Sequence, residues 1–302
     1  MTISGFTMVR NAGKYYFPIK ASIESALPLV DEFIVALGDG DEGDDTLAQI
    51  ESINSPKIKI FHRKWDERLF KDGAVFRAET TFALQQCKGD WCLYLQADEV
   101  LHEKDFASIK SSCEKYLNDK RVEGMLFNYH HFFGDYKHVV RSHGWCSEEI
   151  RIVRSGLGIE SYKDAISFRL NDRKLKVVEI PVSIFHYGWV RPPALMVQKR
   201  KEQDSMHHGK ESAQLIFEKK AKSFDYGPLG QLELFEKEHP AVMKDWIAKH
   251  NWKDDLNYGR SYATLNRPRL KHEQLRYRIQ SFFENRFMGG KQLFGFENWD
   301  RL

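Results

Sequence analysis

Short apolar runs alternate with longer amphipathic segments over the first hundred of the 302 residues. Short apolar runs predict buried strands, whereas apolar residues repeating at three- and four-residue spacing predict helices. On this basis we predict strands at 3–9, 32–37, 58–61 and 91–95, and helices at 16–27, 46–53 and 73–87. Strands separated by helices predict βαβ units with a parallel sheet, so the expected fold class is α/β.

The pattern changes after residue 120. Segments 123–134, 148–154 and 174–189 alternate apolar and polar residues in the manner of antiparallel strands. From Pro192 onward the chain is polar and has a helical pattern. We therefore predict a soft boundary near residue 190, with a mainly helical C-terminal extension over 191–302.

Carboxylates follow two of the predicted strands. The fourth strand runs into Gln96, Asp98 and Glu99, and the second runs into an acidic turn with five carboxylates in residues 39–45. Ligands bind at the carboxyl ends of strands in open α/β sheets, so these side chains are expected to face a crevice. The acidic turn lacks the register of an EF-hand. We select Asp39 from it and expect most of the other acids to be solvated.

Composition excludes several classes of protein. The chain is 42% hydrophobic, 13% aromatic and 29% charged, as in ordinary globular proteins, and its net charge of +3 argues against a nucleic-acid partner. No apolar run approaches the roughly 18 residues of a membrane span, and the N-terminus lacks a signal-peptide layout, so a cytoplasmic protein is expected. The four cysteines fit no zinc spacing and are expected to be buried thiols.

The sequence lacks the motifs of three common enzyme classes. It contains no GxGxxG after the first strand, no GxxxxGK[ST] and no GxSxG, which disfavours dinucleotide enzymes, P-loop NTPases and serine hydrolases of the α/β type. The adjacent His130 and His131 would point to opposite faces of a strand, so we interpret them as structural. His207 and His208 are assigned no role.

Three segments in order resemble inverting family 2 glycosyltransferases of the GT-A fold. They are SGFTMVRNA at 4–12, EFIVALGDGDEGDDT at 32–46 and WCLYLQADE at 91–99. The resemblance covers roughly residues 1–190. It implies a Rossmann-like GT-A domain over 1–190 with mixed sheet and flanking helices, in which 1–100 form the nucleotide half and 101–190 the acceptor half.

The resemblance also implies a site for a nucleotide-sugar and a divalent cation, Mn²⁺ or Mg²⁺. Gln96–Ala97–Asp98 stands where the family has Asp-x-Asp, so Asp98 takes the metal position, with Glu99 as a further candidate. His186, in IFHYGWV at 184–190, matches a histidine near the metal or diphosphate. The implied nucleotide-sugar residues are Thr7, Val9, Arg10, Asn11, Asp39, Arg77, Gln96, Ala97 and Arg191.

A general base is needed to take the proton of the acceptor hydroxyl. SEEIRIVR at 147–154 resembles the family's base segment, which makes Glu149 the first candidate, with Glu148 and Asp164 as alternatives. The alternative is that one or two of these acids have no catalytic role and form ion pairs with Arg151 or Arg154. The cluster Lys199–Arg200–Lys201 would either close over the diphosphate or lie on a solvated helix face.

The resemblance thus implies a metal-dependent inverting glycosyltransferase. The donor would be a nucleoside-diphosphate sugar, UDP first. The acceptor would be a glycan or lipid-linked glycan of bacterial surface-glycan synthesis, reached at the inner face of the membrane. Two rivals are a sugar-phosphate nucleotidyltransferase and a non-catalytic nucleotide-sugar-binding scaffold with a degenerate Asp-x-Asp.

The C-terminal third is basic, with 21 Lys and Arg against 15 Asp and Glu from Val190 onward. Such a surface suits an acidic partner or an anionic membrane, or is simply solvated. Its apolar residues include Phe282, Phe283, Phe287, Leu293 and Phe294. We expect these to dock on the catalytic domain, with a homodimer contact or a peripheral membrane contact as alternatives.

Overall fold

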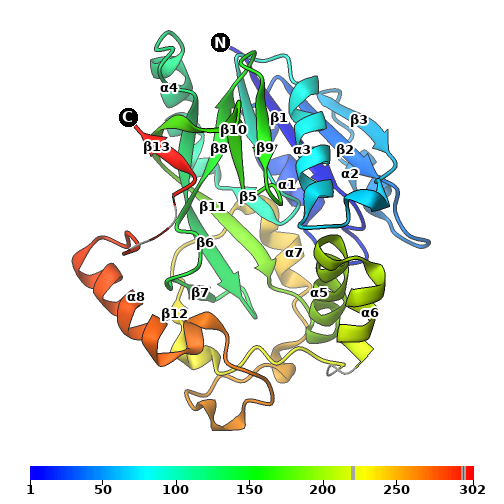
Figure 1. Ribbon diagram of the computed structural model, residues 1–302, viewed down its shortest axis with the longest axis vertical. Coiled ribbons are helices and arrows are strands. Elements are labelled where there is room, and N and C mark those ends of the chain that lie inside the picture. Colours follow the sequence, from blue (N-terminus) through cyan, green and yellow to red (C-terminus); the bar gives the residue numbers. More distant parts are fainter. Residues whose placement is uncertain (219–221, 294, 296) are drawn as a thin grey trace.

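The computed structural model describes residues 1–218, 222–293, 295 and 297–302 (Figure 1). Within them, thirteen strands join in one mixed sheet. The strands are β1 Ile3–Val9, β2 Glu32–Gly38, β3 Ile58–Arg63, β4 Trp91–Tyr94, β5 Glu99–Leu101, β6 Gly124–Phe133, β7 His138–Val140, β8 Glu148–Arg154, β9 Ile159–Tyr162, β10 Ser167–Leu170, β11 Arg173–Trp189, β12 Glu233–Leu234 and β13 Trp299–Arg301. The helices are α1 Ile19–Ala26, α2 Thr46–Glu51, α3 Ala74–Gln86, α4 Phe106–Tyr116, α5 Pro193–His208, α6 Lys210–Glu218, α7 Lys244–Ala248 and α8 Leu275–Phe287.

The sheet has a parallel half and a mixed half. Its main strand order is β3-β2-β1-β4-β8-β6-β11-β10-β9. Strands β3, β2, β1 and β4 are parallel, and β4 then pairs with β8 in the antiparallel direction. The α/β prediction and the predicted parallel half are therefore confirmed. β6 pairs antiparallel with β8 as predicted, but it pairs parallel with β11.

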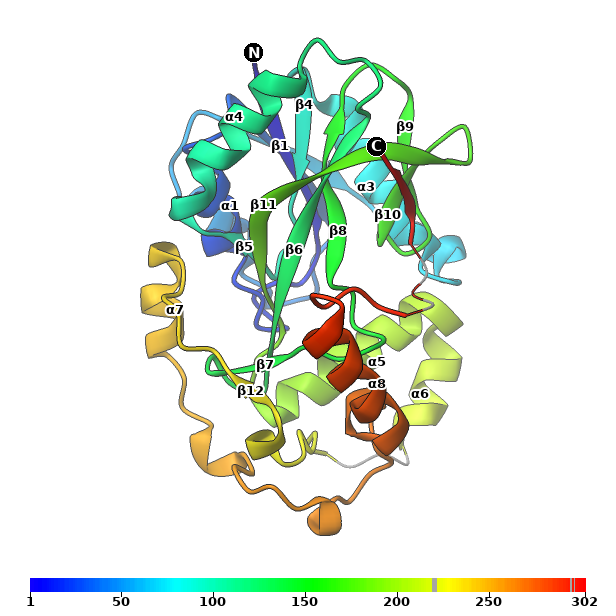
Figure 2. The same ribbon diagram turned by 90° about the vertical axis from the view of Figure 1, so that its left-hand side faces the viewer.

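Helices cover both faces of the parallel half, which explains why every residue of β2 is buried (Figure 2). One face packs against α1 and α4 through residues such as Ile23 and Ile109. The other face packs against α3 through Ala83 and Leu84. Because both faces are covered, these strands read as continuous apolar runs, and that is why the sequence located them.

The C-terminal third is less helical than predicted. α5, α6 and α8 are helices, but residues 222–274 form mostly irregular chain with short 3₁₀ turns. Among the described residues, 3₁₀ turns lie at Glu67–Leu69, Glu103–Asp105, Leu229–Gln231, Ala241–Met243, Lys253–Asp255, Tyr262–Thr264 and Lys271–Glu273. One apolar cluster joins Phe132 and Tyr187 of the sheet to Tyr226 and Trp252 beyond residue 190. The division at residue 190 stays a prediction.

The expected docking of the C-terminal aromatic residues is wrong for the residues that the structure describes. Phe282, Phe283 and Phe287 are exposed, because α8 turns its polar side toward the rest of the molecule. Leu293 is also exposed. Phe294 lies outside the described residues.

The cysteines partly follow the expectation. Within residues 1–218 all four are free thiols, of which Cys92 and Cys113 are buried, whereas Cys146 is exposed. Among the described helices, none combines the length and the apolar character needed to cross a bilayer.

A buried arginine ties β8 to the end of α4. Arg154 donates from Nε to the carbonyl of Val122 at 2.8 Å, and its two terminal nitrogens donate to the carbonyls of Leu117, Tyr116 and Asp119 at 2.8–3.0 Å. The last carbonyls of a helix have no partner within the helix, so this guanidinium satisfies them. Arg154 therefore pairs with backbone carbonyls rather than with one of the candidate bases.

Replacing Arg154 by leucine should lower the free energy of unfolding by about 3 kcal/mol, because it removes the guanidinium hydrogen bonds to four backbone carbonyls, including that of buried Val122. Urea unfolding followed by circular dichroism measures this change. Arg121→Leu is the matched control, since Arg121 lies at the surface and pairs only with Asp119, and it should leave the transition unchanged. Equal effects of the two substitutions would contradict the assigned role of Arg154.

Candidate active site

A pocket of about 150 Å³ lies where the carboxyl ends of β1 and β4 meet α5. Six of the residues predicted for the site line it: Val9, Arg10, Gln96, Ala97, Asp98 and Asp164. α5 closes the opposite side with Lys199, Glu202, Gln203 and Met206. The remaining lining residues are Met8, Tyr15, Phe17, Trp65 and Phe76. The strand-end carboxylate at Asp98 thus faces a pocket, as the sequence predicts.

β11 brings His186 to Asp98. The short strand β5 pairs antiparallel with β11, with Glu99 opposite His186, and the Tyr187 amide donates to the Asp98 carbonyl at 2.8 Å. The Nε2 atom of His186 lies 3.8 Å from the Oδ2 atom of Asp98. A Cβ atom at Gly188 would lie within 2.6 Å of both atoms, so the absence of a side chain there keeps the space beside the pair open.

Hydrogen bonds fix the tautomer of His186. His131 Nε2 lies 2.6 Å from the carbonyl oxygen of Cys146, and since a carbonyl only accepts, this nitrogen carries a proton. Burial above all, with the neighbouring His186, lowers the pKa of His131 to about 3, so its ring is neutral and its Nδ1 accepts. His186 Nδ1, at 2.9 Å, must therefore be the donor. Burial also lowers the pKa of His186, so its ring is neutral as well. Its single ring proton is on Nδ1, and the Nε2 atom near Asp98 is therefore unprotonated.

Two acceptor atoms 3.8 Å apart cannot hydrogen-bond to each other, but they can share a cation. Ligand atoms about 2.1 Å from one Mg²⁺ are about 3.0 Å apart when adjacent and about 4.2 Å apart when opposite. The observed 3.8 Å matches neither separation, so the two side chains would shift slightly to bind one ion together. Among the described residues, no group of three or more His, Cys, Asp and Glu side chains is arranged to hold a metal. Asp98 and His186 would thus supply two ligands, and a substrate and water the others.

Two buried basic side chains lie beside this pair. Lys199 Nζ and Arg191 Nη2 each donate to the Gly188 carbonyl at 2.9 Å. Burial raises the pKa of Asp98, but the positive charge of neighbouring side chains, among them Lys199 and Arg191, more than offsets it, so the pKa of Asp98 is lowered and the carboxylate is ionised. Burial, followed by the charge of Arg191, lowers the pKa of Lys199 to about 7. The local charge favours an incoming anion.

The predicted basic cluster is divided by the helix. Lys199 points into the pocket, whereas Arg200 stacks on Phe224 and Lys201 bonds to Gln214. Arg191 is fully buried, and its terminal nitrogens donate to the carbonyls of Tyr15 and Gly188. The structure therefore does not bring Arg191 to the pocket surface. The basic side chain that lines the pocket from this part of the chain is Lys199.

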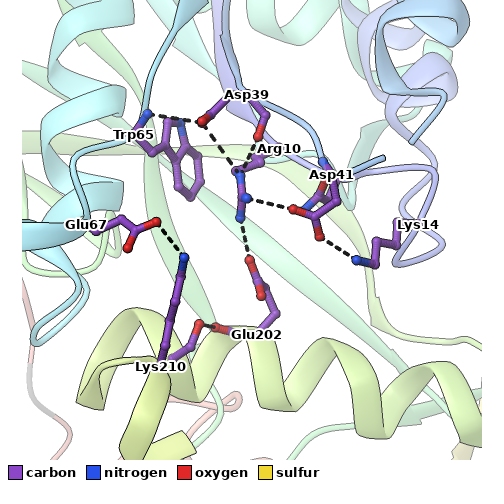
Figure 3. Close-up of polar contacts among 10 residues, drawn as sticks. Arg10, Lys14, Asp39, Asp41, Trp65, Glu67, Glu202 and Lys210 are labelled. Carbon is purple, nitrogen blue, oxygen red and sulfur yellow. Dashed lines mark hydrogen bonds and ion pairs between the residues drawn. The ribbon is translucent and has the colours of Figure 1, made fainter. Parts of the chain in front are cut away.

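An ionic network fastens α5 and α6 over the pocket (Figure 3). Arg10 donates to the Asp39 carbonyl at 2.7 Å, to the Asp41 carboxylate at 2.9 Å and to Glu202 of α5 at 2.6 Å. Asp39 accepts from the Trp65 amide at 3.2 Å, so this half-exposed acid also holds the loop after β3. The acidic turn is consequently not a simple solvated turn, because Arg10 and Glu202 connect it to the helix.

Glu99 forms a buried ion pair with Arg151. Arg151 donates to both carboxylate oxygens of Glu99, at 2.7 and 2.8 Å. Tyr129 and the Gln96 amide add bonds of 2.7 and 3.1 Å to the same oxygens. Because both oxygens are engaged, the structure does not bring Glu99 to the Asp98–His186 pair. Arg151 pairs with Glu99 and leaves Glu149 without such a bond.

The three candidate bases occupy different environments. Glu148 forms an ion pair with Arg301 of β13 at 2.5 Å. Asp164 lies in the turn between β9 and β10 and lines the pocket that contains Asp98. Glu149 is buried, and its Oε2 has no hydrogen-bond partner among the described residues.

Glu149 combines a perturbed carboxyl group with access to a second cavity. Burial is the main cause that raises its pKa to about 8, Arg151 opposes this, and the charges of Glu99 and Asp164 add to it. The second cavity, of about 500 Å³, is lined by Cys146, Ser147, Glu148, Glu149, Lys174, Lys291, Gln292, Gly295, Glu297, Trp299 and Arg301. Glu149 therefore lines this second cavity, and the charge of Asp164, which lines the first pocket, contributes to its raised pKa.

Three further predicted residues stay outside the pocket. Thr7 is buried and bonds to the Met8 carbonyl at 3.3 Å. Asn11 has a left-handed backbone with φ of 55° and accepts from the Asp41 amide at 2.7 Å. Arg77 pairs at the surface with Glu160 at 3.1 Å.

Sequence reasoning missed Glu202, Trp65 and the role of His131. Glu202 and Trp65 reach the pocket only through the packing of α5 and the loop after β3. For His131 the sequence did contain a signal, which is the alternation of side chains along its strand. Alternation along the strand directs one of His130 and His131 to the His186 side, but the sequence does not show which side carries chemistry.

Comparisons with known proteins give weak similarities. No family model matches the sequence, and no curated protein matches it. Staphylococcus aureus TarS shares 13% identity over 67% of this chain and 39% of its own, with a TM-score of 0.37. Its 1–349 form shares 12% identity over 72% of both chains, also with a TM-score of 0.37.

A Mycobacterium tuberculosis glucosyl-3-phosphoglycerate synthase, solved with Mn²⁺, UDP and phosphoglyceric acid, shares 20% identity over 44% of this chain and 43% of its own, with a TM-score of 0.28. This chain thus spans about two fifths of the TarS and synthase chains.

The ion pair of Glu99 yields a stability test. Glu99→Gln should lower the free energy of unfolding by about 3 kcal/mol, because it leaves the buried Arg151 charge without its counter-ion. Asp98→Asn, the equivalent change one residue earlier, should cost about 1 kcal/mol or less, since Asp98 makes no such bidentate pair. Urea unfolding compares the two variants. A greater loss in Asp98→Asn would contradict the division into a structural carboxylate at Glu99 and a pocket-facing carboxylate at Asp98.

Proposed function

We propose that this chain is a GT-A glycosyltransferase that uses Mn²⁺ or Mg²⁺ to transfer a sugar, with inversion, from a nucleoside-diphosphate donor to an acceptor hydroxyl. The observation that carries the proposal is the 3.8 Å pairing of Asp98 Oδ2 with the unprotonated Nε2 of His186. UDP is the first candidate nucleotide. The acceptor is a glycan or lipid-linked glycan of bacterial surface-glycan synthesis, used at the cytoplasmic face of the membrane.

Asp98 and His186 would hold the cation, and the diphosphate and water would complete its coordination. When bound, the cation supplies Lewis-acid stabilisation of the charge that develops on the leaving diphosphate. Gln96 in place of an acid fits this division, because two protein ligands suffice where the substrate supplies others. The amide side chain of Gln96 instead bonds to the Ala165 carbonyl at 3.4 Å, beside Asp164.

Lys199 would contact the same diphosphate. Its pKa of about 7 reflects a buried site in which Arg191 disfavours the charged form. An anionic diphosphate would raise this pKa, so Lys199 would bind a proton as the donor binds. The buried ammonium would then stabilise the leaving group in an environment that excludes water.

Glu149 is the proposed base. During transfer the acceptor oxygen bonds to the anomeric carbon, the bond from that carbon to the diphosphate oxygen breaks, and the acceptor proton passes to Oε2 of Glu149. That oxygen is buried without a hydrogen-bond partner among the described residues, and the Glu149 residue lines the 500 Å³ cavity, which has room for an acceptor. Asp164 is the alternative base, because it lines the pocket with Asp98.

The donor requires α5 to move. Pockets for small ligands usually measure about 300–1,000 Å³, whereas this pocket has about 150 Å³. The contact of Glu202 with Arg10 holds α5 against the end of β1. We propose that the helix opens to admit the nucleotide-sugar and then returns, which places Lys199 against the diphosphate.

Calorimetric titration with UDP tests the ligand-binding pair. UDP should bind in the presence of Mn²⁺, and Asp98→Ala or His186→Ala should weaken that binding by about 100-fold, because each removes a direct ligand. Asp254→Ala, at an exposed carboxylate, is the matched control and should bind as the native chain does. Mn²⁺-dependent binding that survives in both site variants would contradict the proposed metal position.

The pH profile of turnover tests the base. A carboxyl group with a raised pKa is protonated at low pH, so turnover with a UDP-sugar should rise with pH through a midpoint near 8. Glu149→Gln should lower turnover about 100- to 10,000-fold and leave UDP–Mn²⁺ affinity unchanged.

Two variants separate the alternatives. Glu148→Gln should keep turnover within a few-fold, because Glu148 is paired with Arg301. Loss of turnover in Asp164→Asn but not in Glu149→Gln would move the base to Asp164. Sugar transfer that is undetectable in the native chain, together with Mn²⁺-dependent UDP binding, would favour a non-catalytic binding protein.

A further inference from the structure

Helix α8 faces the rest of the molecule with its polar side. The His143 amide donates to Ser281 Oγ at 2.8 Å, and His143 Nδ1 lies 2.8 Å from Glu284 Oε1. Asn285 Nδ2 donates to the Arg141 carbonyl at 3.0 Å. A surface helix ordinarily packs its apolar side inward, so this orientation is inverted.

The apolar side of α8 is correspondingly exposed. Its side chains are Leu275, Ile279, Phe282, Phe283 and Phe287, which are between 50% and 69% exposed. At 3.6 residues per turn they fall within an arc of about 140° on one side of the helix. Figure 1 shows α8 on the opposite side of the molecule from α5 and α6. Arg276 and Arg286 project from within the same arc, so this face carries positive charge among its apolar side chains. An exposed face with this many large apolar side chains marks an interaction surface.

The exposed charges on the same helix are all positive. Within residues 275–287, all of which the structure describes, Arg276, Arg278 and Arg286 are exposed, and the single acid, Glu284, is buried against His143. Lys291 follows the helix and is also exposed. Such a face fits the interface of an anionic bilayer, where apolar side chains insert while the long arginine side chains extend to the headgroups.

We propose that α8 lies in the surface of an anionic phospholipid membrane, with its phenylalanines inserted between the lipids and its arginines on the headgroups. Charge favours this occupant over a second copy of the chain. A symmetric dimer would place the same patch against itself and so bring the three arginines of one copy against those of the other. The sequence left docking, dimerisation and membrane contact open, and the orientation of α8 favours the last.

The position of α8 links this surface to the acceptor cavity. Glu284, Asn285 and the following Gly289 and Gly290 line a further cavity of about 500 Å³. That cavity shares Cys146, Ser147 and Gln292 with the one beside Glu149. If the proposed function holds, α8 at the bilayer would bring the acceptor cavity to a lipid-carried acceptor.

Flotation of the full chain with lipid vesicles tests the proposal. The native chain should float with vesicles of phosphatidylcholine mixed with phosphatidylglycerol, and at least tenfold less with phosphatidylcholine alone. The double variant Phe282→Ser/Phe287→Ser should lose at least nine tenths of the binding to the mixed vesicles. Arg276→Gln/Arg286→Gln should also reduce it, and the residual binding should depend less on salt.

Leu215→Ser is the matched control. Leu215 is 67% exposed on α6, so this change removes an exposed apolar side chain away from α8 and should leave flotation unchanged. All substituted side chains are exposed, and unchanged melting temperatures would confirm that the variants fold. Absence of native binding to the mixed vesicles would overturn the proposal. So would a stable dimer in sedimentation that Phe282→Ser/Phe287→Ser dissociates.

Membrane binding is measured without donor or metal, so it can fail separately from the proposed function. Asp98→Ala should float as the native chain does, although it should no longer bind UDP with Mn²⁺. Flotation that is lost in Asp98→Ala would contradict the assignment of membrane binding to α8.

Discussion

The buried ion pair between Glu99 and Arg151 holds the candidate site together. It ties the turn after β4 to β8, and the Gln96 amide and Tyr129 hydroxyl bond to the same carboxylate. Because Glu99 is fixed in this way, the preceding Asp98 is directed into the pocket. The same arginine is occupied by Glu99 and is not available as a partner for Glu149. One ion pair thereby separates the Asp98 carboxylate, which faces the pocket, from the buried carboxyl group of Glu149 with its raised pKa.

The second constraint is the hydrogen-bond chain from the Cys146 carbonyl through His131 to His186. It crosses from the segment before β8 to β11, so the tautomer of His186 depends on strands that are distant in sequence. Lys199 and Arg191 lie on the other side of the pair and meet at the Gly188 carbonyl. Unprotonated acceptor atoms with buried basic side chains beside them fit a ligand that contains both a cation and a phosphate. On this account the pocket is preorganised on its strand side and adjustable on the α5 side.

The sequence located the strands of the parallel half well, because strands covered on both faces appear as apolar runs. The position of Asp98 just after an apolar strand predicted that it faces a crevice, whereas His186 was implied only by the family resemblance. The sequence did not separate Glu148 from Glu149, because neighbours on a strand differ only in the face that they occupy, and Arg301 reaches Glu148 from the far end of the chain. Glu202 and Lys199 enter the pocket through the packing of α5. The amphipathic pattern of α8 does not reveal which side faces solvent, and expecting the apolar side to be buried gave the wrong orientation.

The most direct test of the account is whether His186 ligates the metal through Nε2. Pulsed electron paramagnetic resonance of Mn²⁺ bound together with UDP detects a directly coordinated imidazole nitrogen as a ¹⁴N modulation. The account predicts this modulation in the native chain and its loss in His186→Ala. Bound Mn²⁺–UDP without nitrogen coupling in the native chain, or with coupling that persists in His186→Ala, would contradict it.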